Sequence, residues 1–120
     1  MYLYSFEKLE VWQLSRKLAG EIYSISKDFP KEEIYGLTSQ LRRAAISVSS
    51  NIAEGTSRIS NKDKANFSVI AFSSLMETLN QLILANDLGF LNDEKLNTFR
   101  ILINEISNKL NALRKSQLNT

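Results

Sequence analysis

The chain has 120 residues, 43% of them hydrophobic and 23% charged, with a formal net charge of +2, no cysteine and no histidine. These values fit one globular domain over residues 1–120. Without cysteine, disulfides, thiolate nucleophiles and Cys-ligated zinc are excluded. Without histidine, the commonest general base and the commonest transition-metal ligand are missing. No apolar run approaches the roughly 20 residues of a membrane helix, and the start lacks the basic region of a signal peptide. We expect a cytoplasmic protein with no catalytic residue, cofactor, metal or membrane partner.

Charge is unevenly distributed along the sequence. Residues 1–40 have five basic and six acidic side chains, residues 41–70 have five and two, and residues 71–120 have five of each. The central excess of +3 is much weaker than the dense basic patches that usually bind nucleic acid. A solvated helix face is the simpler interpretation of this excess.

Apolar residues recur at helical spacing in the first half of the chain. The first helix is expected over residues 6–29, ended by Pro30. Pro30 and the acids after it are typical of a first helical turn, but Gly36 interrupts that pattern, so the start of the second helix stays open. From Leu37 the spacing predicts a helix over residues 37–55, with Gly55 as its C-terminal cap.

Two longer helices are predicted in the second half, over residues 61–88 and 92–115. Ser60 is placed to cap the third helix, and Gly89 follows its end. The polar tail from Ser116 to Thr120 is expected to be frayed. Short loops between four such helices predict an all-α, antiparallel up-down-up-down four-helix bundle.

The third helix is apolar on two sides, which indicates burial on more than one side. One face contains Phe67, Ala71, Leu75, Leu82 and Ala85. We expect a homo-oligomer that buries the second face, with a candidate interface formed by Ile46, Val69, Phe72, Met76 and Ile83. The alternative is a monomer in which the N-terminal residues Tyr2, Leu3, Tyr4 and Phe6 fold across that face.

A polar ladder lies beside the core face of the second helix, at Arg43, Ser47, Ser50 and Glu54. Catalysis by these serines is not expected, because a nearby glutamate is a poor base for serine. The functional hypothesis is a shallow phosphate-binding surface that repeats around an oligomer and so gains affinity from each added contact. Its candidate nucleic-acid-binding residues are Arg42, Arg43, Arg58, Lys62 and Lys64. The simpler alternative is a solvated stripe with a weak Glu54–Arg58 pair.

Three blocks of the sequence carry a family resemblance: FEKLEVWQLSRKLAGEIYSISKDFP, EEIYGLTSQLRRAAISVSSNIAEG and LANDLGFL, with Arg58 between the last two. Residues 36–45 and 50–55 are its most specific parts. The chain resembles the bacterial 23S ribosomal RNA intervening-sequence proteins, many of which have proline where this chain has Ser49. The resemblance implies a homopentameric ring of four-helix bundles without a settled activity.

One branch of that family is similar to accessory proteins of diversity-generating retroelements, which bind a reverse transcriptase and nucleic acid through a strongly basic ring. This chain has a net charge of only +2 per subunit. The role of those accessory proteins therefore transfers poorly to this chain. From the arginines of the second helix and the lysines after it, we expect a non-enzymatic oligomeric bundle that associates with RNA or DNA. The alternative is a protein-only scaffold that docks a protein partner on its ring.

Overall fold

The structure, a computed structural model, describes residues 1–119. A short 3₁₀ turn, η1 (Ser5–Lys8), precedes helix α1 (Glu10–Ser26), and a second turn, η2 (Lys31–Glu33), precedes α2 (Leu37–Thr56). Helices α3 (Asn61–Asp87) and α4 (Asp93–Leu118) complete the chain. No strand occurs within these described residues, so the prediction of an all-α protein with four helices is confirmed.

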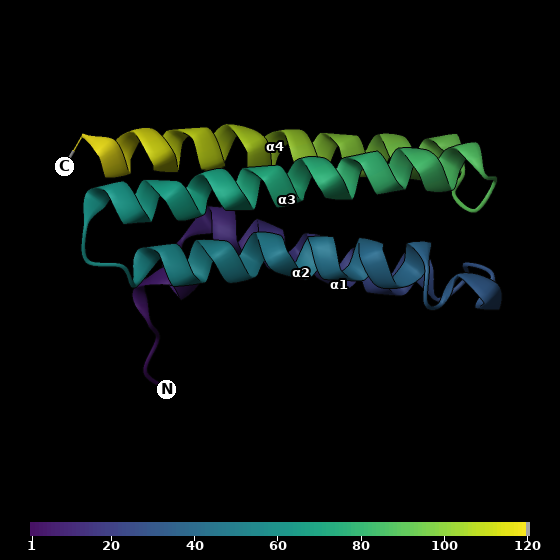
Figure 1. Cartoon of the computed structure of the whole chain (residues 1–120), viewed down its shortest axis with the longest axis horizontal. Coiled ribbons are helices and arrows are strands. Elements are labelled where there is room, and N and C mark those ends of the chain that lie inside the picture. The colour runs from purple at the N-terminus through teal and green to yellow at the C-terminus, as the bar shows by residue number, and fades with distance from the viewer. Residues whose placement is uncertain (120) are drawn as a thin grey trace.

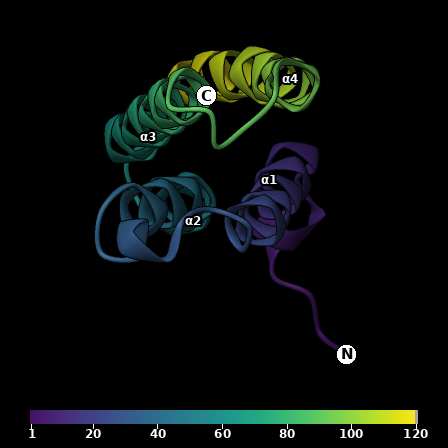
Figure 2. The ribbon, with the colours of Figure 1, turned by 90° about the vertical axis from the view of Figure 1, so that its right-hand side faces the viewer.

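Consecutive helices run in opposite directions along the molecule (Figure 1). The α1–α2 and α3–α4 connections lie at one end, and both ends of the chain lie with the α2–α3 connection at the other. Figure 2 shows α1 and α2 in one layer and α3 and α4 in a second layer above it. The core fills the space between the layers, and its fully buried side chains include Leu18, Ile22, Leu41, Val48, Ile52, Leu75, Leu82, Ile103, Ile106 and Leu110.

Local chemistry sets the bounds of the two long helices. The hydroxyl of Ser60 accepts a hydrogen bond from the Asp63 backbone N–H at 3.1 Å, which satisfies a free donor at the start of α3. The Asn92 side chain does the same for the Lys95 N–H at 2.8 Å, at the start of α4. After α3 the chain reverses at Gly89, whose φ of 82° suits glycine and disfavours other residues.

Three predictions about helix ends are wrong. The first helix, α1, spans residues 10–26 and not 6–29, because extended backbone at Leu9 separates it from η1 and it ends at Ser26, four residues before Pro30. Gly55 does not cap α2, because the helix continues to Thr56 and Gly55 is buried inside it. The tail is not frayed from residue 116, because α4 continues to Leu118. Gln117 is only 8% exposed, and its side-chain oxygen accepts a 2.7 Å hydrogen bond from the Ser68 hydroxyl. Thr120, the last residue of the predicted tail, lies outside the described residues.

The second apolar face of α3 is partly covered within the chain itself. Phe72, Met76, Leu79 and Ile83 are half-buried against the core. The reason is that α3 contacts α2 and α4 on two different sides. Val69 stays 45% exposed. Packing inside one bundle therefore accounts for most of the surplus apolar surface.

The N-terminal residues do not cover α3, so the predicted monomer alternative is wrong in that detail. Tyr2, Leu3 and Tyr4 are exposed, and η1 packs on α1 and α2. By length and composition alone, α3 is apolar enough to cross a membrane, with a mean hydropathy of 1.3 over its most apolar window. Its contacts with two neighbouring helices give a sufficient reason for that apolarity.

Candidate nucleic-acid interface

Arg42 holds α2 to α1. Its Nε donates a 2.8 Å hydrogen bond to the hydroxyl of Ser26, which is 3% exposed, and one terminal nitrogen lies 3.5 Å from the backbone oxygen of Tyr23. The guanidinium also stacks over the Tyr23 ring, 4.6 Å from its centroid. Such a cation above an aromatic face is attracted by the ring electrons. Arg42 is therefore engaged in contacts between helices, which leaves its charge poorly placed to hold a phosphate.

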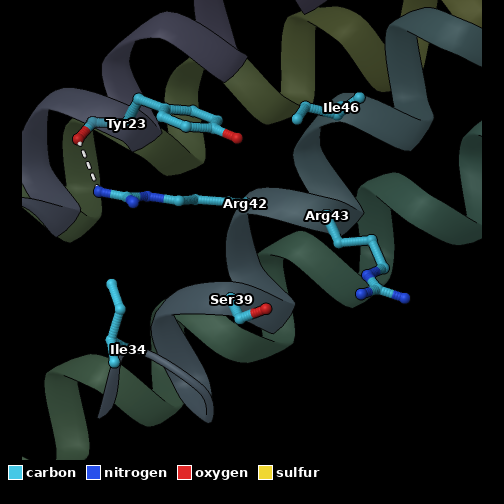
Figure 3. A pocket seen from close by; sticks show the side chains of 6 residues that line it. All are labelled: Tyr23, Ile34, Ser39, Arg42, Arg43 and Ile46. Atoms are coloured by element: carbon cyan, nitrogen blue, oxygen red, sulfur yellow. Dashed lines mark hydrogen bonds between the residues drawn. The ribbon is translucent and has the colours of Figure 1, made fainter. Parts of the chain in front are cut away.

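Arg43 points away from Arg42. Figure 3 shows Arg42 extended toward Tyr23 and Arg43 turned to the other side of α2. Both border an exposed hollow between α1 and α2, together with Tyr23, Ile34, Ser39 and Ile46. Adjacent residues on a helix are about 100° apart, so the two guanidinium groups do not form one site.

The predicted polar ladder divides into a half-buried part and an exposed part. The Ser47 and Ser74 hydroxyls are 2.9 Å apart and join α2 to α3. The Asn51 amide donates to the Ser47 backbone oxygen at 2.8 Å and to its hydroxyl at 2.9 Å. Ser50 and Glu54 face solvent. The half-buried part is thus a structural link between two helices, and its hydrogen bonds are made within the bundle.

Arg58, Lys62 and Lys64 lie at the opposite end of α2 from Arg42 and Arg43. Sixteen residues separate Arg42 from Arg58, about 24 Å at the helical rise of 1.5 Å per residue. Within the described chain Arg58 forms no ion pair with Glu54, and its guanidinium lies over the Phe67 ring at 5.2 Å from the centroid. Of the five predicted nucleic-acid-binding residues, three therefore lie together at this end of α2, and Arg42 and Arg43 lie apart from them at the other end.

Two cations that the sequence did not point to lie at this same end. Arg114 and Lys115 are exposed in the last turns of α4. The Ser68–Gln117 hydrogen bond places those turns beside the start of α3, where Lys62 and Lys64 are. The signal for this grouping was present in the helix order, since a fourth antiparallel helix ends where the third begins.

Charge is segregated along the bundle when each helix is divided near its middle. Residues 1–17, 47–74 and 106–119 form the end that holds both chain ends in Figure 1. We name this the basic end, because it has nine basic and four acidic side chains, a net charge of +5. The acidic end, residues 18–46 and 75–105, has six basic and nine acidic side chains, a net charge of −3.

Other kinds of site have little support among residues 1–119. No group of three or more acidic side chains is placed to hold a metal ion in this part of the chain. A shallow hollow of about 190 Å³ at the basic end lies between α3 and α4, and it is lined by Ser68, Val69, Phe72, Leu110, Asn111 and Arg114. The arrangement offers exposed cations on a rigid helical support, which suits phosphate contacts.

Comparison with known proteins agrees with this fold. A solved structure of a protein of unknown function from the S23 ribosomal protein family of Bacteroides thetaiotaomicron is similar, with a TM-score of 0.81. It is 24% identical, and the match covers 88% of this chain and 95% of that one. None of the curated proteins matches the chain.

The model of one protein family, the 23S rRNA-intervening sequence proteins, matches residues 7–112. This range begins within η1 and includes α1, α2, α3 and most of α4. The match therefore extends over nearly all of the helical bundle. The chain belongs to the 23S rRNA-intervening sequence protein family.

Proposed function

We propose that this protein is a non-enzymatic cytoplasmic bundle that associates with RNA or DNA through its basic end. The observation that supports this is the segregation of charge, with a net charge of +5 on the basic end against −3 on the acidic end. Phosphates are attracted to one end and repelled from the other, so a nucleic acid would meet the bundle end-on. Arg58, Lys62, Lys64, Arg114 and Lys115 are the cations that would contact it.

The expected affinity of one subunit is modest. Each neutralised phosphate releases counterions, and the logarithm of the binding constant then falls with the logarithm of salt by about 0.7–0.9 per contact. Five cations that project from three segments of chain allow only a few such contacts. Repetition of the surface in an oligomer would raise the apparent affinity without new kinds of contact.

Fluorescence anisotropy with a labelled RNA tests this proposal. A Lys62→Glu/Lys115→Glu variant should weaken binding at least tenfold and reduce the dependence on salt, because both residues are exposed at the basic end. The matched control, Lys27→Glu/Lys31→Glu, makes the same change in net charge at exposed positions of the acidic end. An equal loss of affinity in both variants, or binding by the wild type that does not depend on salt, would reject the basic end as the binding surface.

We also propose that the chain assembles into a ring, a pentamer by family resemblance. Ile46 is 42% exposed on the α1–α2 layer, and Val69 is 45% exposed on the α3–α4 layer. A head-to-tail interface joins two different faces of neighbouring subunits, and it produces a ring when the rotation from one subunit to the next closes. Native mass spectrometry tests this proposal, and a concentration-independent mass of 13.7 kDa would reject it.

If the wild-type protein binds no nucleic acid, the ring would be a scaffold for a protein partner instead. Exposed apolar side chains on both layers, among them Ile46 and Ile70, favour this second candidate. A pull-down that recovers the same defined protein with and without nuclease treatment would support it.

A further inference from the structure

We infer that the basic end takes single-stranded nucleic acid in preference to duplex, with Tyr2 and Tyr4 as platforms on which unpaired bases stack. This inference rests on the proposed association with nucleic acid. The observation that carries it is the presence of two exposed aromatic rings at the same end of the bundle as the exposed cations. Tyr2 is 80% exposed and Tyr4 is 65% exposed.

The two rings form an open aromatic surface. They contact each other edge to face, with centroids 5.3 Å apart and an interplanar angle of 80°. Figure 1 shows the chain start at the same end as the α2–α3 connection, which carries Arg58. No other ring contact of Tyr2 or Tyr4 occurs within residues 1–119.

Tyr4 is exposed but its backbone is held in place. Its N–H donates a 2.8 Å hydrogen bond to the Glu7 carboxylate, and its carbonyl accepts one from the Glu7 N–H at 3.0 Å. Phe6 packs edge to face on Trp12 with centroids 5.0 Å apart, which ties η1 to α1. A ring presented by a fixed backbone loses less conformational freedom when a ligand binds, so more of the stacking energy remains as affinity.

Single strands and duplexes differ in what they offer to this surface. Both supply phosphates for the cations, but bases in a duplex are already stacked on each other and are closed to a protein ring. An unpaired base exposes its face, and proteins that bind single strands combine a basic surface with such aromatic rings. The tyrosines should therefore add affinity for single strands alone.

A comparison of two probes tests this. The probes are a fluorescein-labelled oligouridine and an RNA duplex with the same number of phosphates, and anisotropy measures the affinity for each. Tyr2→Ala/Tyr4→Ala should bind the oligouridine about tenfold more weakly, bind the duplex as the wild type does, and keep the salt dependence of both. Tyr35→Ala removes a ring that is 94% exposed at the acidic end, and it should change neither affinity.

The charge variant separates failure of this inference from failure of the proposed function. Suppose that Lys62→Glu/Lys115→Glu lowers the affinity for both probes but the tyrosine variant binds oligouridine like the wild type. The stacking role is then overturned, and the basic end remains supported as the binding surface. If the charge variant has no effect on either probe, the proposed function fails. A changed native mass in the tyrosine variant would also overturn the stacking role, because the rings would then belong to an assembly interface.

Discussion

A β-carbon on Gly55 would lie only 2.8 Å from the β-carbon of Phe67. Real Cβ atoms essentially never approach other atoms that closely, and a neighbouring Cβ cannot move aside by side-chain rotation. Glycine therefore lets the end of α2 and the start of α3 touch. The connection between these helices carries Arg58, so the same contact fixes where that cation sits on the basic end.

Gly55→Ala should lower the free energy of unfolding by about 1 kcal/mol. Overpacking typically costs roughly 1–3 kcal/mol and outweighs the gain of about 1 kcal/mol that alanine brings to a helix interior. Urea unfolding measures this. Gly20→Ala is the control, because a β-carbon there meets nothing within 4 Å, and it should stabilise α1 by up to about 1 kcal/mol. A Gly55→Ala variant as stable as the wild type would contradict the close approach.

Arg42→Ala should destabilise the fold by about 1–3 kcal/mol, because it removes a charged hydrogen bond to Ser26 and the stack on Tyr23. Arg43→Ala changes an exposed side chain without these contacts and should stay within about 0.5 kcal/mol of the wild type. Thermal unfolding distinguishes the two. Equal stability of both variants would show that Arg42 does not hold α1 to α2. Tests of nucleic-acid binding are best made with Arg42 intact.

The buried hydrogen bond between Ser68 and Gln117 should stabilise the end of α4. In a double-mutant cycle of Ser68→Ala and Gln117→Ala, the coupling energy should be about 1 kcal/mol, as for a neutral buried hydrogen bond. Hydrogen exchange of the last turn of α4 should accelerate in both single variants. A coupling energy near zero would mean that the last turn is held by other contacts.

Assembly should depend on the two exposed apolar faces. Ile46→Glu and Val69→Glu should each shift the native mass toward that of a monomer, because a buried unpaired carboxylate is costly at an interface. Ile101→Glu is the control, since Ile101 is 72% exposed on α4, the helix that contributes neither proposed contact residue. Light scattering over a range of concentrations measures this. An oligomer that survives both face substitutions would place the interface elsewhere.

Helical spacing was enough to predict which residues of α2 face the core. Leu41, Val48 and Ile52 are buried as their three- and four-residue spacing indicates. What covers the second apolar face of α3 was harder to predict. Spacing shows that Phe72 and Met76 lie on an apolar side, but it does not distinguish a neighbouring helix of the same chain from a neighbouring subunit.

The candidate site was predicted only in part, because charge was compared along the sequence and not along the bundle. The charge of residues 41–70 combines Arg42, which lies at the acidic end of the bundle, with Lys62, which lies at the basic end. The charge of residues 71–120 likewise combines Asp93 of the acidic end with Lys115 of the basic end. An up-down bundle brings together the alternate ends of successive helices. Only after folding do Lys62 and Lys115 belong to one surface.

Both termini of the chain lie at the basic end (Figure 1). A purification tag fused to either terminus would therefore sit next to the surface whose binding is to be measured, and a polyhistidine or acidic tag would change its charge. The α1–α2 connection lies at the far end and has exposed positions such as Glu32. Because the chain has no cysteine, one placed at position 32 would accept a fluorophore there alone and leave both termini untouched.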